Sequence, residues 1–153
     1  MGSLSACIFE WEEADFNKLM SAKRGELINA GIRDPSPRAI QKAIKKDELA
    51  RHCRRRTRGA TETATLIEAV LLEMTLATDA NGAPLLSQEM MSIWEEQKKH
   101  LVCLQDPPGV SLYIVTGSIC KGGVTLPVLR CARGTTSLES FHLHLARYNY
   151  VHS

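Results

Sequence analysis

The chain has 153 residues, which is enough for one domain with its own hydrophobic core. Apolar residues make up 44% and charged residues 24% of the sequence, as in an ordinary soluble globular chain. The net charge is only +2, so no global field draws the molecule onto nucleic acid, and any basic binding surface must be local. No apolar run reaches membrane-spanning length and the first residues lack a secretory signal, so we expect no membrane partner.

The 5 cysteines are scattered through the chain and never occur in CxxC spacing. Their odd number and their spacing favour reduced thiols in a nuclear or cytoplasmic protein. A structural zinc site is the competing interpretation, because His100 lies near Cys103 and His142 lies near His144. Since paired cysteine knuckles are missing, we expect no resident cofactor in this chain.

Helices dominate the first two thirds of the sequence. Apolar residues at helical spacing predict four helices, over residues 8–30, 37–53, 61–75 and 87–104. Ser36 and Ser87 are suitable N-caps, and Pro37 suits the first helical position. The side chains expected to face inward include those of Phe9, Leu19, Ile67, Met90 and Ile93.

The character of the sequence changes after QDPPG at 105–109, which ends the fourth helix. Residues 110–115 and 124–131 are predicted strands of a hairpin, joined by the glycine-containing loop TGSICKGG. Pro127 cannot donate to a strand ladder, so the second strand must lie at an edge or be bulged there. The chain therefore divides into a helical region at 1–105 and a hairpin-plus-helix region at 106–153.

A further helix is predicted from Thr136 onward. Thr136 as N-cap and Glu139 three residues later match a capping box. An apolar stripe at helical spacing follows, made of Leu138, Phe141, Leu145 and Tyr148. We expect this stripe to pack on the hairpin. Glu139 and His142 share a face beside it, which suits either a plain capped helix or a metal-binding catalytic carboxylate.

The densest charge run is RHCRRRTRG at 51–59. Together with nearby lysines it forms a basic segment at 42–58, whose members are Lys42, Lys45, Lys46, Arg51, Arg54, Arg55, Arg56 and Arg58. One interpretation is a solvated helix end, where cations complement the helix dipole. The other is a patch that contacts nucleic-acid phosphates or serves as a nuclear localisation signal, which the predominance of arginine favours.

The segment RCARGTTSLESFHLHLAR at 130–147 resembles the last-carboxylate motif of transposon-derived proteins with a DDE-type, RNase H-like integrase core. The likeness extends upstream through ELARHCRRRTRGATETATLIEAVL, PLLSQEMMSIWEEQKKHLVCLQDPPGVSLY and KGGVTLPVLRCARG, and so covers most of the chain. The resemblance implies that residues 8–105 correspond to a helical insertion. It also implies that Glu139 is the third carboxylate of a two-metal site, for which Mg²⁺ is the expected ion.

The chain departs from that pattern in its aspartates. Members of the resembled family carry two aspartates on strands before the helical insertion, and here those strands would have to precede residue 1. The aspartates present lie in helix-like or loop contexts, at Asp15, Asp34, Asp47, Asp79 and Asp106. One carboxylate does not assemble a two-metal site. We therefore expect Glu139 to be vestigial, and to bind metal only if partner aspartates come from elsewhere.

These observations lead to a mainly α fold, a bundle of about four helices followed by a β-hairpin and a C-terminal helix, as a partial RNase H-like core. The expected function is that of a partial or domesticated transposase-derived protein, catalytically inactive, which binds nucleic acid weakly and non-specifically through the basic segment. The alternative is a helical protein–protein interaction scaffold. No glycine-rich phosphate loop, GxSxG or HExxH motif indicates another enzyme class.

Overall fold

The structure is a computed structural model that describes residues 3–83 and 85–133. Within this part, 54% of the residues are helical and 19% lie in strands, in two antiparallel sheets of two strands each. The fold is therefore mixed α/β, and the predicted mainly α bundle with a partial RNase H-like core is wrong. The helix predicted from Thr136, with Glu139, lies outside the described residues.

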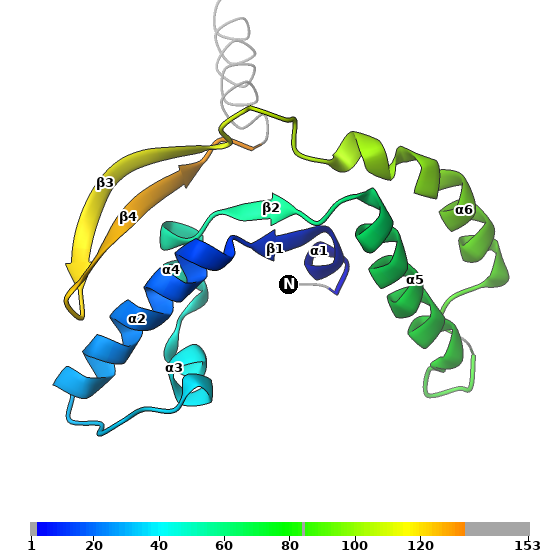
Figure 1. Ribbon diagram of the computed structural model, residues 1–153. Coiled ribbons are helices and arrows are strands. Elements are labelled where there is room, and N and C mark those ends of the chain that lie inside the picture. Colours follow the sequence, from blue (N-terminus) through cyan, green and yellow to red (C-terminus); the bar gives the residue numbers. More distant parts are fainter. Residues whose placement is uncertain (1–2, 84, 134–153) are drawn as a thin grey trace, which may run out of the picture.

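The elements form an arch with two lobes (Figure 1). One side, the hairpin lobe, holds α2 (Glu13–Asn29), α3 (Pro37–Ala43), α4 (Lys46–His52), β3 (Tyr113–Lys121) and β4 (Val124–Cys131). The other side, the α5 lobe, holds α1 (Ser3–Ile8), α5 (Ala60–Leu76), α6 (Gln88–Lys98) and the 3₁₀-helix η1 (Lys99–Leu104). Between them runs a two-stranded ribbon of β1 (Phe9–Trp11) and β2 (Arg55–Thr57).

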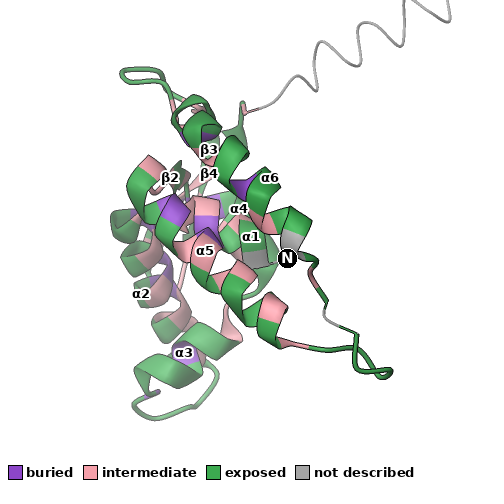
Figure 2. Cartoon of the chain, turned by 90° about the vertical axis from the view of Figure 1, so that its right-hand side faces the viewer, coloured by how far each residue is buried: buried purple, intermediate pink, exposed green. Residues whose placement is uncertain are grey.

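Each lobe has its own apolar cluster. In the hairpin lobe Leu19, Ala22, Cys53 and Leu126 are buried together. In the α5 lobe the buried set is Cys7, Ala64, Ile67, Trp94 and Leu101. In Figure 2 the buried residues appear as short purple segments of the cartoon among longer exposed and intermediate segments. Among the described residues, no helix is both long and apolar enough to cross a membrane.

The β1–β2 ribbon overturns two predictions. The helix predicted over 8–30 is interrupted by β1, and the arginine run, for which a solvated helix end was one of two interpretations, contains β2. The strands are antiparallel, with Glu10 opposite Arg56, and these two side chains form an ion pair of 2.8 Å. Phe9 and Trp11 flank Glu10 in an alternating pattern that suits a strand, but three residues are too few to outweigh the helical spacing around them.

The helix predicted over 37–53 is also divided, because Ile44 adopts an extended conformation and separates α3 from α4. The predicted cap at its start is confirmed, since Ser36 Oγ accepts a hydrogen bond of 3.3 Å from the Ala39 amide. Leu19 and Ile67 are buried as expected. Met90 and Ile93, predicted to face inward, are 41% and 51% exposed instead, because α6 is covered on one side only.

The hairpin is longer than predicted, and its loop is shorter. β3 continues through the segment taken as a loop and reaches Lys121. The turn consists of Gly122 and Gly123, whose φ values of +50° and +79° suit a tight hairpin turn that only glycine adopts readily. A bulge between Val115 and Gly117 shifts the register of β3. Pro127 lies opposite Ser118 in a sheet of two strands, both of which are edges, so its missing amide is tolerated.

The hairpin is anchored on α2 and α4 by polar contacts as well as by apolar packing. His52, only 1% exposed, donates from Nδ1 to the Pro127 carbonyl at 2.7 Å. Glu48 accepts from Lys23 of α2 at 2.7 Å and from Lys121 of β3 at 2.9 Å. The Glu48 carboxylate thus joins three elements of the hairpin lobe.

Candidate nucleic-acid interface

The structure divides the predicted basic segment into two groups. The arginines at 54–58 lie on or beside β2, whereas Lys42, Lys45, Lys46 and Arg51 lie on or between α3 and α4. The two groups differ in their surroundings. The arginines of the first group contact carboxylates or aromatic rings of the same molecule.

Arg54 forms the most enclosed of these contacts. Its guanidinium donates to both carboxylate oxygens of Asp15, at 2.7 and 2.9 Å, and its backbone amide donates to the same carboxylate at 3.0 Å. The Asp15 side chain is only 10% exposed. Burial by itself raises the pKa of Asp15, but the hydrogen bonds from Arg54 outweigh it, so the pKa lies below its usual value. Arg54 therefore neutralises a buried carboxylate of α2.

Arg56 and Arg58 are also paired with carboxylates. Arg56 contacts Glu10 at 2.8 Å across the ribbon. Arg58 contacts Glu10 at 3.0 Å and Glu62 at 2.9 Å, and it also donates to a backbone carbonyl of α1. These pairs fasten β2 to β1 and to the start of α5, which leaves less of their charge for an outside anion.

Arg55 belongs to a stack of cations and aromatic rings. Its guanidinium lies 5.2 Å from the Trp11 ring centroid and 5.5 Å from that of Phe9. Arg133, which follows β4, lies 5.4 Å from the centroids of both Phe9 and Tyr113. Such contacts are favourable because the ring faces are electronegative. The stack joins the ribbon to the base of the hairpin.

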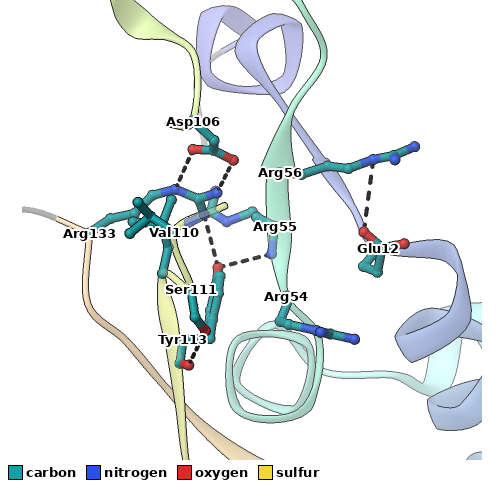
Figure 3. Close-up of a pocket in the computed structure, with 10 residues that line it drawn as sticks. Glu12, Arg54, Arg55, Arg56, Asp106, Val110, Ser111, Tyr113 and Arg133 are labelled. Atoms are coloured by element: carbon teal, nitrogen blue, oxygen red, sulfur yellow. Dashed lines mark hydrogen bonds and ion pairs between the residues drawn. The ribbon is translucent and has the colours of Figure 1, made fainter. Parts of the chain in front are cut away.

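A small cavity of about 190 Å³ lies beside this stack, lined by four arginines, two carboxylates and Tyr113 (Figure 3). Arg133 forms a two-pronged ion pair with Asp106, and Asp106 also accepts from the Thr57 amide at 3.1 Å. The Tyr113 hydroxyl accepts from the Arg55 amide at 2.9 Å and from Arg133 at 3.2 Å. These bonds engage Asp106, Arg133 and the Tyr113 hydroxyl within the fold, and they join β2 to the base of the hairpin.

The second group of cations has a different environment. Lys42, Lys45, Lys46 and Arg51 are exposed, and among the described residues none of them has an ion-pair partner. Arg38 of α3 shares both properties and was missed by the sequence prediction. Helical spacing could have revealed it, because Arg38 and Lys42 are four residues apart and lie on the same face of α3. We call these five residues the α3–α4 cations.

The carboxylates of residues 3–83 and 85–133 do not gather into a metal site. Asp15 and Asp106 are paired with arginines, Asp34 contacts Arg24 at 3.0 Å, and Asp79 accepts hydrogen bonds from its own turn. No group of three or more His, Cys, Asp or Glu residues suited to a metal is found within residues 3–83 and 85–133. Glu139, His142 and His144, on which part of the metal predictions rested, lie outside those residues. The other candidates for a zinc site, His100 and Cys103, both lie in η1, and Cys103 is an exposed free cysteine.

Comparison with known protein families, with curated proteins and with solved structures finds no match for this chain.

Proposed function

We propose that this protein binds the phosphate backbone of nucleic acid weakly and without sequence preference, through the α3–α4 cations. The observation that carries the proposal is their exposure without carboxylate partners among the described residues, in contrast to the paired arginines of β2. Such cations release condensed counterions when they approach phosphates, and this release favours binding at low salt. From the resemblance of residues 130–147 to the last-carboxylate motif, we also propose that the protein is transposase-derived, nuclear or cytoplasmic, and without catalytic activity of its own.

The expected salt dependence follows from the number of contacts. Each neutralised phosphate contributes a slope of about −0.9 to a plot of log affinity against log salt concentration. If roughly four of the five cations make contact together, the slope is about −3 to −4, with micromolar or weaker dissociation constants. Sequence preference is not expected, since contacts to phosphates carry no sequence information.

The test is a fluorescence-anisotropy titration of a mixed-sequence duplex at three salt concentrations. The variant Lys42→Ala/Lys45→Ala/Lys46→Ala is compared with a control that loses the same charge elsewhere, Lys18→Ala/Arg33→Ala/Lys99→Ala. All six residues are exposed, so both variants should fold. We expect the first variant to reduce the magnitude of the slope by roughly 2 to 3, and the control to leave it nearly unchanged.

If the slope falls equally in the two variants, total charge controls the binding, and the α3–α4 cations are not the binding site. No binding even at low salt would overturn the function. The second candidate, a helical interaction scaffold, would then be favoured by the exposed apolar side chains of α5 and α6, among them Leu72 and Ile93 at 59% and 51% exposure.

A further inference from the structure

An apolar groove lies between α1, α5 and α6. It has a volume of about 220 Å³, and seven of the eight described residues that line it are apolar, the exception being Gln97. Leu4, Met90 and Ile93 at this groove are 49%, 41% and 51% exposed. Beneath them lie Ile67 and Trp94, which belong to the buried cluster of the α5 lobe. A contiguous apolar surface of this kind usually has a partner.

The chain itself contains a segment of matching chemistry. The sequence of 134–153 predicts an amphipathic helix with the stripe Leu138, Phe141, Leu145 and Tyr148. Such a stripe needs an apolar surface to cover it. The described part of the chain ends at Arg133, so this segment begins there and has all of 134–153 available to reach a partner surface.

A contact to the residue that follows α1 links Arg133 to one wall of the groove. Its guanidinium stacks 5.4 Å from the ring of Phe9, and Phe9 directly follows Ile8, which lines the groove. At 1.5 Å per residue, a helix over 136–148 would measure about 20 Å and α6 measures about 16 Å, so one can run along the other. A tethered segment also has a high effective concentration at a nearby surface.

We propose that residues 134–153 dock in this groove of the same molecule, with the apolar stripe against α6. The hairpin is the competing surface, because Ile114 and Val115 of β3 are 45% and 66% exposed. Those two residues are followed by Thr116, Gly117 and Ser118, which leaves the apolar surface of the strand short. Ile114 and Val115 are neighbours on a strand, so their side chains point to opposite faces. Seven apolar residues from α1, α5 and α6 line the groove, which makes it the better match for a stripe that spans three helical turns.

The test is hydrogen–deuterium exchange of the full chain, read by mass spectrometry. Phe141→Asp/Leu145→Asp should speed exchange in the α6 peptide (88–98) by roughly tenfold, because the groove loses its cover. Ile93→Asp should speed exchange in residues 134–153 by a similar factor. Val102→Asp is the matched control for the groove variant: Val102 is 69% exposed and does not line the groove, so this change should alter neither segment.

Reciprocal effects of the tail and groove variants, with a silent control, would support docking. If Phe141→Asp/Leu145→Asp speeds exchange only in the β3–β4 peptide, the segment docks on the hairpin and the proposal is overturned. Unchanged exchange in α6 in that variant would also overturn the proposal. A loss of α6 protection when the wild-type protein is diluted would show that a second copy supplies the segment, which overturns docking within one molecule.

Discussion

Gly25 of α2 and Gly122 of the hairpin turn touch through their backbones. A Cβ atom on Gly25 would lie 2.1 Å from the Gly122 carbonyl oxygen, and one on Gly122 would lie 2.1 Å from the Ala22 carbonyl oxygen. No side chain fits at either position without moving backbone. The two glycines therefore set how closely the hairpin approaches α2.

This contact makes Gly25→Ala an informative change. Alanine normally stabilises a helix relative to glycine by about 0.5–1 kcal/mol, but here the added methyl group must displace the turn. We expect a net loss of about 1–3 kcal/mol in the free energy of unfolding, measured by urea denaturation. The control is Gly117→Ala, where an added Cβ meets no atom within 4 Å. A Gly25→Ala protein as stable as the control would contradict the close approach.

The pairing of Arg54 with Asp15 predicts a structural role for an arginine that the sequence placed in the binding surface. Arg54→Ala leaves the Asp15 carboxylate with one backbone donor. We therefore expect the free energy of unfolding, measured by thermal or chemical denaturation, to fall by about 1–3 kcal/mol. Lys42→Ala, at an exposed position, should change stability by no more than about 0.5 kcal/mol. If both changes were equally mild, Arg54 would be available to contact phosphates after all.

The Glu48 network predicts a dependence of stability on acid pH. Burial by itself raises the pKa of Glu48, but hydrogen bonds from Lys23, the Lys45 amide and Lys121 hold it at about 2, against a usual value of 4.5. Because the folded-state pKa is depressed, the stabilisation is fully present above about pH 4.5 and is lost as the pH falls toward 2.

We therefore expect Glu48→Gln to lower the free energy of unfolding by about 2–3 kcal/mol at neutral pH. The difference from wild type should shrink as the pH falls from about 4.5 toward 2. Urea unfolding at neutral pH and at about pH 4 and 3 measures it. Glu96→Gln, on the exposed side of α6, is the control and should show no such convergence. A constant difference between Glu48→Gln and wild type at all three pH values would refute the network's role.

Glu139 supplies a prediction about chemistry. A single carboxylate does not hold two divalent ions, and Asp15 and Asp106 are bound to Arg54 and Arg133. We expect the purified chain to show no Mg²⁺- or Mn²⁺-dependent nicking of supercoiled plasmid above the level of Glu139→Gln. Nicking by the wild type that disappears in Glu139→Gln would mean that Glu139 is part of a complete metal site.

Local signals in the sequence were sufficient for several elements. The Ser36–Pro37 start of α3 follows from cap chemistry, and the apolar spacing of α5 gave its bounds to within about one residue. The strand over 124–131 was also correct, because β-type residues fill it and glycines precede it. In each case the residues that determine the structure are close neighbours in the chain.

The failures at the ribbon and at the arginine run share a cause, which is pairing between distant residues. Phe9–Trp11 becomes a strand only because β2 lies beside it, and nothing near Phe9 reveals that partner. The same holds for the candidate site. The run of arginines looked like one surface, but Arg54 and Arg56 meet carboxylates 39 and 46 residues away. A count of nearby charges does not detect such partners.

The interleaving of the two lobes determines the order in which the protein can fold during synthesis. The hairpin lobe combines α2–α4 with β3 and β4, and Leu126 completes its apolar cluster. All of α5 and α6 is therefore translated before that cluster can close. While the ribosome extends the chain, Leu19 and Ala22 remain without their hairpin partners, and the first half of the chain is exposed to misfolding or chaperones until the hairpin emerges.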